Sequence, residues 1–217
     1  MMMFMLDTKH ELLRDIYLIT GIGLTSNIYL LGKTDLTLID AGNDSQPSTI
    51  ITELNRSHLA LNDIKQIIIT HAHFDHIGGL QKLLRYISPK IYVHEKELPQ
   101  LTPILGNKPV TTIHDGDVLS TEIGSLQTLH TSGHSPGAIC LYDQTRRVLY
   151  SGDTVFPNGL FGRCDLNGGD TNALIQSLHY LSTLDADILL PGHEYPIFSQ
   201  AKQHLELSFR NAQLFLG

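Results

Sequence analysis

The sequence contains little cysteine. Only two of its 217 residues are cysteines, Cys140 and Cys164. Two thiols can close at most one bridge, which excludes the disulfide framework of a small secreted domain and fits a reducing compartment. Because 41% of the residues are hydrophobic and only 17% are charged, we expect a globular protein with a substantial apolar core.

The sequence also lacks a long apolar run and an excess of positive charge. Its apolar start, residues 1–6, has no basic leader and is ended by Asp7, Lys9 and Glu11. It is too short for a signal peptide or a membrane span. The net charge of −7 argues against a nucleic-acid-binding surface. We therefore expect a cytoplasmic protein that binds neither membranes nor nucleic acid, and its oligomeric state stays open.

Apolar runs rich in β-branched residues alternate with helical patterns along the chain. They predict strands at residues 15–20, 27–31, 36–40, 67–70, 91–94, 126–131, 138–142, 148–151 and 187–190. Helices are predicted from Asp44 or Ser45 to residue 59, and at 76–86, 95–101, 171–184 and 199–216. Residues 102–117 and 155–170 read as irregular loops. In both halves a β-rich run leads into a helix, which favours an α+β fold of two packed sheets with helices outside, in a single domain over residues 1–217.

Potential metal ligands are concentrated directly after one of these strands. The segment Thr-His-Ala-His-Phe-Asp-His, residues 70–76, holds His71, His73, Asp75 and His76. Imidazole nitrogen and carboxylate oxygen suit zinc, iron or manganese. A polar loop that is His-rich by accident is much less probable for this motif. So many ligands in one turn indicate a metal site, and more than one ion.

Three further segments place a potential ligand just past an apolar strand. They are Gly-His-Ser-Pro-Gly with His134, Ser-Gly-Asp-Thr with Asp153, and Pro-Gly-His with His193. A glycine before each ligand gives the backbone room to turn into a crowded site. Because active sites of α/β proteins collect at the carboxyl ends of strands, we expect all four segments to contribute to one site.

This ordered set of motifs resembles the metallo-β-lactamase superfamily, over residues 38–193. The full complement of ligands is similar to that of glyoxalase II-type hydrolases, and residues 162–170 resemble their compact members, which lack a C-terminal helical domain. The resemblance implies a four-layer αβ/βα sandwich of two mixed sheets flanked by helices. It also implies two divalent ions, zinc first with iron or manganese as alternatives. Their implied ligands are His71, His73 and His134 for one ion, Asp75, His76 and His193 for the other, and Asp153 as the bridge.

The resemblance implies a hydrolase that cleaves a thioester of the hydroxyacyl-glutathione kind, a small molecule, by attack of a metal-bridging hydroxide. Asp75 and Asp153 are then the catalytic carboxylates, and Asp40 orients a ligand imidazole. A thiol leaving group has a pKa near 8.5, so its departure needs little help from a general acid. Because only about two dozen residues follow His193, glutathione itself is less well supported than the thioester chemistry.

Two other activities of the same superfamily stay open. A persulfide dioxygenase uses a single iron held by two histidines and one carboxylate, and a lactonase turns the same hydroxide on an ester. The presence of all seven ligands favours two metals.

Several residues near the motifs have more than one interpretation. Arg163 either meets an anionic substrate group or pins its own loop, and Cys164 either touches substrate or fills space. His130, four residues before His134, is expected to have a structural role. Ser135 has no base assigned to it, so a serine nucleophile is disfavoured. Cys140 is expected to be buried and inert.

Overall fold

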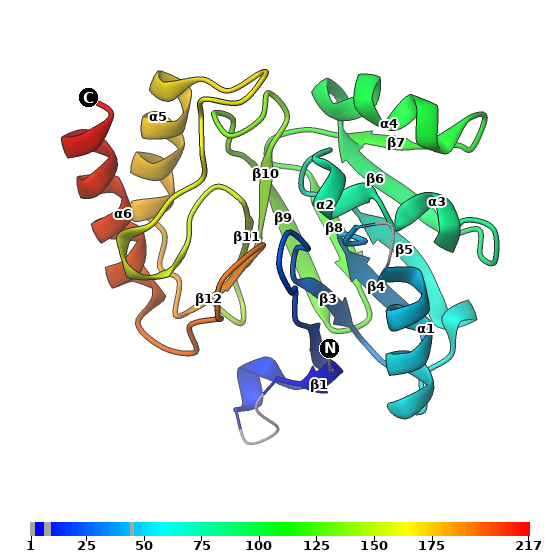
Figure 1. Ribbon diagram of the computed structural model, residues 1–217. Helices are drawn as coiled ribbons and strands as arrows, with labels where there is room; N and C mark the ends of the chain where they lie inside the picture. Colours follow the sequence, from blue (N-terminus) through cyan, green and yellow to red (C-terminus); the bar gives the residue numbers. More distant parts are fainter. Residues whose placement is uncertain (1–2, 7–9, 44–45) are drawn as a thin grey trace. The chain divides into compact units, whose positions relative to one another are not determined.

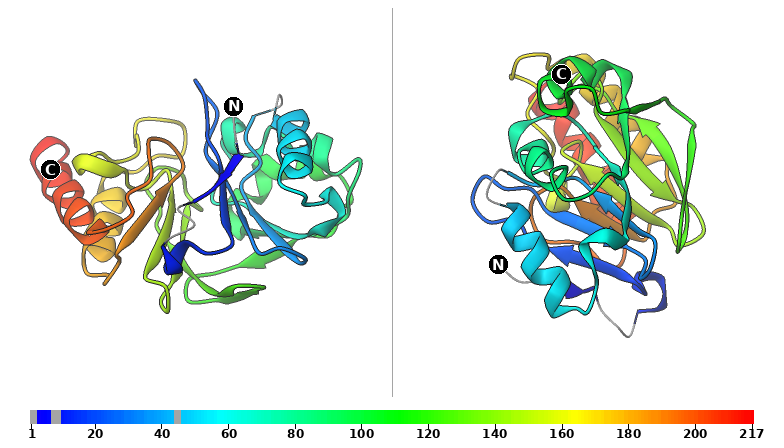
Figure 2. Two further views of the ribbon diagram at one scale, coloured as in Figure 1. Left: turned by 90° about the horizontal axis from the view of Figure 1, so that it is seen from below. Right: turned by 90° about the vertical axis from the view of Figure 1, so that its right-hand side faces the viewer.

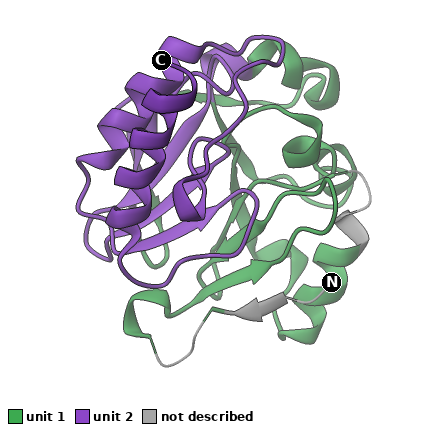
Figure 3. Cartoon of the chain, turned by 60° about the vertical axis from the view of Figure 1, so that its left-hand side comes forward, with its two compact units in different colours: residues 1–93, 98–113, 120–124 green, residues 94–97, 114–119, 125–217 purple. Residues whose placement is uncertain are grey.

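The computed structural model describes residues 3–6, 10–43 and 46–217. Contacts between residues divide the chain into two compact units, which are coloured separately in Figure 3. Unit 1 comprises residues 1–93, 98–113 and 120–124, and unit 2 comprises residues 94–97, 114–119 and 125–217. The expectation of a single domain over residues 1–217 stays a prediction.

A seven-stranded mixed sheet, in chain order from β1 to β7, dominates unit 1 (Figure 1). Strands β1 to β4 pair antiparallel, whereas β4, β5 and β6 pair parallel. The strands are β1 Met3–Met5, β2 Ile16–Ile19, β3 Ile28–Leu31, β4 Leu36–Ile39, β5 Ile64–Ile68, β6 Lys90–His94 and β7 Thr111–Ile113. The helices are α1 Gln46–Arg56, α2 Phe74–Ile77, α3 Leu80–Leu83 and α4 Leu98–Leu105, with short 3-10 helices η1 Glu11–Leu13 and η2 Leu61–Asp63.

The core of unit 1 joins one face of this sheet to its helices. Ile67 of β5 and Leu38 of β4 are fully buried and belong to the same apolar cluster as Leu54 of α1 and Leu101 of α4. All four residues of β4 are buried, and β5 ends in the buried pair Ile67 and Ile68, as expected for parallel strands covered by helices. The carboxyl end of β5 is thereby held rigidly where the histidine-rich segment begins.

Unit 2 contains a five-stranded mixed sheet in the order β12-β11-β10-β9-β8, in which β11 and β12 pair parallel. The strands are β8 Val118–Thr121, β9 Gly124–His130, β10 Ile139–Asp143, β11 Val148–Gly152 and β12 Ile188–Pro191. The helices are α5 Thr171–Ser182 and α6 Ala201–Phe215, with short 3-10 helices η3 Glu95–Glu97 and η4 Pro157–Gly159. Figures 1 and 2 show α5 and α6 side by side against this sheet. Leu178, Leu205 and Leu149 join the two helices to β11 in one buried cluster.

The α+β class, with two mixed sheets flanked by helices, is confirmed. Each predicted strand overlaps an observed one, and the helices predicted at 171–184 and 199–216 are present as α5 and α6. The predicted helix start at Asp44 or Ser45 lies outside the described residues, and α1 ends at Arg56. Within the described residues, no helix has both the length and the apolarity that crossing a bilayer requires.

The predicted helix over residues 76–86 is wrong, because the structure has two short helices, α2 and α3, in this region. The carbonyl of Asp75 accepts the backbone N–H and the hydroxyl of Ser26, at 3.2 and 2.9 Å. The N–H of Gly79, which would pair with that carbonyl in a continuous helix, donates to the carbonyl of Gly42 at 3.1 Å. Tertiary hydrogen bonds therefore replace the helical one at a glycine pair that has low helix propensity.

The predictions for residues 95–117 are wrong in part. A 3-10 turn occupies Glu95–Glu97, and α4 then continues to Leu105, inside the stretch expected to be irregular. Residues Thr111–Ile113 of the same stretch form β7. Helix α4 contains a proline, Pro103, which favours a loop in a sequence pattern, but Leu101 and Leu105 pack into the core and hold the helix.

Candidate metal centre

The histidine-rich segment of unit 1 is delivered by the carboxyl end of β5. The residues that follow the strand turn into α2, so that His71 and His76 are fully buried while His73 and Asp75 are partly exposed. The rings of His71 and His73 have centroids 4.7 Å apart, and those of His71 and His76 are 4.0 Å apart. Potential ligand atoms on His71 and His73 lie within 4.8 Å of each other.

Asp40 holds this segment from the end of β4. Its backbone is left-handed, with φ of 60°, a conformation that aspartate tolerates better than most residues. Its Oδ1 accepts the backbone N–H of Thr70 at 2.8 Å, and its Oδ2 accepts the Thr70 hydroxyl at 2.8 Å. Oδ2 also lies 2.8 Å from Nδ1 of His76. One buried carboxylate therefore accepts hydrogen bonds from three donors of the histidine-rich segment.

These hydrogen bonds determine which ring nitrogens carry hydrogen. Because the carboxylate only accepts, Nδ1 of His76 donates to Asp40 and the lone pair of the neutral ring is on Nε2. The Thr70 hydroxyl donates its hydrogen to Asp40, so the hydroxyl oxygen accepts a hydrogen bond from Nδ1 of His71 at 3.1 Å. His71 therefore also has its lone pair on Nε2. The expected role of Asp40 thus extends, through Thr70, to a second imidazole.

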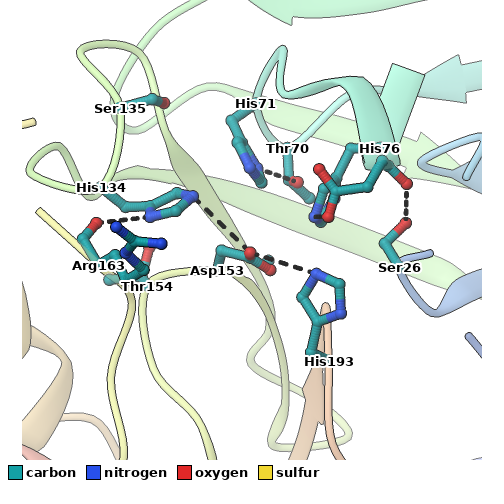
Figure 4. Close-up of polar contacts among 12 residues, drawn as sticks. Ser26, Thr70, His71, His76, His134, Ser135, Asp153, Thr154, Arg163 and His193 are labelled. Carbon is teal, nitrogen blue, oxygen red and sulfur yellow. Dashed lines mark hydrogen bonds and ion pairs between the residues drawn. The ribbon is translucent and has the colours of Figure 1, made fainter. Parts of the chain in front are cut away.

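Unit 2 contains the other predicted ligands, His134, Asp153 and His193. Figure 4 shows both imidazoles directed toward the Asp153 carboxylate. Nε2 of His134 lies 3.7 Å from Asp153 Oδ2, and Nε2 of His193 lies 3.4 Å from the same oxygen. Nδ1 of His134 is 2.7 Å from the carbonyl oxygen of Arg163. Since a carbonyl only accepts, His134 also has its lone pair on Nε2.

The separations between these atoms test whether the residues fit a metal. Hydrogen bonds between such groups measure about 2.7–3.2 Å, whereas neighbouring ligands of a tetrahedral ion bound at 2.0–2.1 Å lie about 3.3–3.4 Å apart. The Asp153 pairs in unit 2 lie at 3.4 and 3.7 Å, and the His76–Asp75 pair in unit 1 lies at 3.8 Å. All three separations are longer than a hydrogen bond: the His193–Asp153 pair has the spacing of neighbouring ligands, and the other two pairs are a few tenths of an ångström wider. The donor set of imidazoles and carboxylates suits zinc, iron or manganese.

Close backbone approach makes room for this arrangement at Gly162. A Cβ atom there would lie 1.8 Å from the carbonyl oxygen of Asp153 and 3.2 Å from Nδ1 of His134. No side chain fits at that position. The glycine allows the loop after Phe161 to pass against Asp153 and to bring the Arg163 carbonyl to His134.

The side chain of Arg163 pins its own loop. Its guanidinium makes two hydrogen bonds of 2.9 Å to the carboxylate of Asp165, and both side chains are largely exposed. This pairing lowers the pKa of the Asp165 carboxyl. The loop-pinning contact of Arg163 is thus observed, a substrate contact of its side chain stays a prediction, and its main-chain carbonyl contacts the predicted ligand His134.

The two cysteines have different surroundings. Cys164 is partly buried, with its sulfur 3.4 Å from the Thr171 hydroxyl, and the choice between filler and substrate contact stays open. Cys140 is fully buried in β10, and burial raises the pKa of its thiol to about 11. At neutral pH this thiol is protonated and therefore inert, as expected.

Among the described residues, His130 belongs to neither of the side-chain groups that could hold a metal ion. Its Nε2 donates to the carbonyl of Pro136 at 2.9 Å, and its ring stacks on that of His94 at a centroid distance of 4.2 Å. Burial, with a further contribution from His130, lowers the pKa of His94 to about 4. His94 is therefore neutral at physiological pH, and the hydrogen bond and ring stacking of His130 agree with the structural role expected of it.

Glu97 was not identified from the sequence, and it binds the loop that carries His134. Glu97 is 1% exposed, and its Oε1 accepts the hydroxyl of Ser135 at 2.8 Å and the backbone N–H of Gly137 at 2.7 Å. Ser135 is itself 2% exposed. Its hydroxyl is therefore buried and engaged with Glu97, which agrees with the expectation that Ser135 is not a nucleophile.

Comparison with known proteins gives a consistent result. The family signature described as "Metallo-beta-lactamase superfamily" matches residues 21–193. The chain is 33% identical over 187 residues to the "Probable metallo-hydrolase YqgX" of Bacillus subtilis, covering 78% of this chain and 85% of that protein. A solved structure, "TTHA1623 in a di-iron-bound form", superposes with a TM-score of 0.71 at 30% identity and covers 89% of this chain and 96% of that one.

A more specific similarity covers less of the chain. A "Hydroxyacylglutathione hydrolase" of Francisella tularensis subsp. novicida is 34% identical over 135 residues. The match spans 61% of this chain and only 50% of that protein. The other half of that enzyme lies outside the match.

Proposed function

Because the chain belongs to the metallo-β-lactamase superfamily of metallo-hydrolases, we propose that it hydrolyses a small-molecule thioester at a two-metal centre. The ligands proposed are His71, His73 and His134 for one ion, Asp75, His76 and His193 for the other, and Asp153 between them. The proposal is carried by the arrangement of the imidazoles, since His71, His76 and His134 all have Nδ1 occupied by the protein and the lone pair on Nε2.

Each residue has a defined task in this proposal. When bound, divalent metal supplies a hydroxide nucleophile at neutral pH and positive charge for the developing oxyanion. Asp40 and Thr70 orient two imidazoles, and the Arg163 carbonyl orients a third. Asp75 and Asp153 supply negative charge that offsets the cations.

Thioesters are the proposed substrates for two reasons. The chain is 34% identical over 135 residues to a hydroxyacylglutathione hydrolase, an enzyme that by its name cleaves a thioester. In addition, a thiolate departs without a proton, whereas an alkoxide needs one, and the described site has no evident proton donor. We propose no requirement for glutathione, because the match covers only half of that relative.

The proposal is tested by metal analysis and a substrate series on one preparation. We expect about two metal ions per chain, as the two-metal chemistry requires. At equal metal loading, a short acyl thioester and S-lactoylglutathione should react faster than the matching oxygen ester and a simple lactone. The variant Asp153→Ala should lose metal and at least about 100-fold in kcat/KM.

Two outcomes contradict the proposal in different ways. A preference for the lactone over both thioesters would remove the thioesterase assignment and favour a lactonase. One tightly bound iron per chain, together with oxygen uptake on a persulfide, would favour the dioxygenase.

A further inference from the structure

The loop that carries His134 is bonded on both sides of this residue. On one side, the Ser177 hydroxyl donates to the carbonyl of Ser132 at 2.7 Å, and the N–H of Asp170 donates to the carbonyl of Gly133 at 2.9 Å. These contacts tie the start of the loop to α5 and to the residue before it. The imidazole itself is fixed by the Arg163 carbonyl.

On the other side of His134, the contacts converge on Glu97. A single oxygen, Oε1, accepts both the hydroxyl of Ser135 and the N–H of Gly137. Hydrogen bonds to a charged acceptor are stronger than neutral ones, and a buried carboxylate is costly unless it receives them. Glu97 therefore binds the loop strongly, one residue and three residues after the proposed ligand.

Gly137 shows that the fit around Glu97 is close. A Cβ atom on Gly137 would lie 2.8 Å from Cγ and 2.9 Å from Oε1 of Glu97, and 3.0 Å from Nδ1 of His94. The space that a side chain would occupy is thus filled by the Glu97 side chain and the His94 ring. Glycine at residue 137 and glutamate at residue 97 depend on each other.

We propose that Glu97 is a positioning residue, which holds the loop over residues 132–137 so that His134 is pre-placed as a metal ligand. This inference rests on the proposed function for the role of His134, but the anchoring of the loop does not depend on metal. In this proposal Glu97 acts through its hydrogen bonds with Ser135 and Gly137. Its removal should therefore loosen the loop and, as a consequence, weaken the metal site.

The experiment compares Glu97→Ala, Glu97→Gln and Gly137→Ala with the wild-type protein. Amide hydrogen exchange of the metal-free protein reports on the loop, and zinc affinity, measured by competition with a chelator, reports on the site. Glu97→Ala should raise exchange in peptides covering residues 132–137 by about tenfold or more. It should also weaken zinc binding by about 10–100-fold. Glu97→Gln keeps an oxygen that can accept both hydrogen bonds and should stay within about threefold of wild type.

Glu53→Ala is the matched control. Glu53 is another buried glutamate, 2% exposed, which pairs with Arg56 in α1 of unit 1. The Glu53→Ala substitution removes a comparable buried side chain, so this variant should have lower global stability but unchanged amide exchange in the loop and unchanged zinc affinity. Gly137→Ala should displace Glu97 and reproduce the loop and zinc effects of Glu97→Ala, which keeps the test open if the alanine variant of Glu97 does not fold.

The possible failures are distinguishable. Wild-type exchange over residues 132–137 in both Glu97→Ala and Gly137→Ala would overturn the inference, whatever the protein does with zinc. Looser loops with unchanged zinc affinity would also overturn it, since Glu97 would then have no effect on His134. If His134→Ala and wild type bind zinc equally well, the proposed function fails at this ligand, and the exchange result still decides whether Glu97 holds the loop.

Discussion

At the scale of single residues, the site depends on hydrogen-bonding groups that orient the imidazole rings. Asp40 is the clearest case, because its two oxygens serve three donors, the N–H and hydroxyl of Thr70 and Nδ1 of His76. Two imidazoles thereby present Nε2. The hydrogen-bond partner of a ligand histidine commonly decides its tautomer, and with it the affinity for metal.

We expect Asp40→Asn to weaken metal binding although it hardly changes size. Asparagine has one acceptor oxygen in place of two, so at least one of the three donors loses its partner, and an amide N–H faces another N–H. Zinc affinity should fall by about 10–100-fold. Nitrogen NMR of the imidazoles should show His76 or His71 shifting toward the other tautomer.

Asp143→Asn is the control for this substitution. Asp143 is also buried, at 4% exposed, and accepts the N–H of Arg146 at 2.9 Å in the turn after β10. Its partner Arg146 belongs to none of the segments that carry the predicted ligands, so the zinc affinity of Asp143→Asn should remain at the wild-type value. Equal zinc affinities for Asp40→Asn and wild type would contradict the proposed role of Asp40.

At the scale of elements, one carboxylate joins two turns of unit 1. Oε2 of Glu122 accepts the backbone N–H groups of Lys33, Thr34 and Asp35, each at 2.8 Å. The turn between β3 and β4 is thereby tied to the turn between β8 and β9, almost ninety residues later in the chain. These three bonds lower the pKa of Glu122 from 4.5 to about 2.

The depressed pKa predicts a pH dependence of stability. Because the carboxylate is favoured in the folded state, its contribution is present above the unfolded pKa of 4.5 and is lost as the pH falls toward 2. Glu122→Gln should therefore destabilise the protein at pH 7 by about 1 kcal/mol, a modest value because the side chain is exposed and screened. That corresponds to a Tm lower by roughly 2–4 °C.

The difference between Glu122→Gln and wild type should shrink as the pH is lowered from 5 to 2.5 in thermal or urea melts. The exposed pair of Glu206 and Arg210 on α6 supplies the control, since Glu206→Gln removes a long contact of 3.9 Å. That variant should change Tm by much less. A constant difference for Glu122→Gln across this pH range would contradict the assignment.

At the scale of the whole molecule, metal binding and folding should be coupled. Each unit has its own sheet and its own buried cluster, so each has a source of stability without metal. The predicted ligands nevertheless come from both units. A metal that binds only the native chain adds stability according to its concentration relative to Kd.

Removing metal should therefore lower the melting temperature. At a metal concentration of 100–1,000 times Kd, binding adds about 2.7–4.1 kcal/mol, so chelation should lower Tm by roughly 5–15 °C. Calorimetry with and without chelator measures this shift. His134→Ala should show a smaller shift than wild type, and His130→Ala, which removes a structural histidine, should keep most of it. An unchanged Tm after complete chelation would contradict metal binding to the native chain.

The sequence by itself determined the type of chemistry and much of the framework. Potential ligands follow apolar strands at His71, His134 and His193. The strand pattern and the spacing of the ligands are both local signals, because each depends only on residues that are close together in the sequence. The overlap of the predicted strands with the observed ones, and the superfamily match over residues 21–193, confirm that part.

Only the tertiary structure decided which groups hold the predicted ligands in place. Glu97 meets Ser135 across 38 residues, and Glu122 meets Lys33 across 89, and neither pair leaves a periodic trace in the sequence. The break between α2 and α3 has the same origin, since the carbonyl of Asp75 takes partners from Ser26. Hydrogen bonds between distant segments depend on where the folded backbone brings donors and acceptors together, and local propensity contains no information about that.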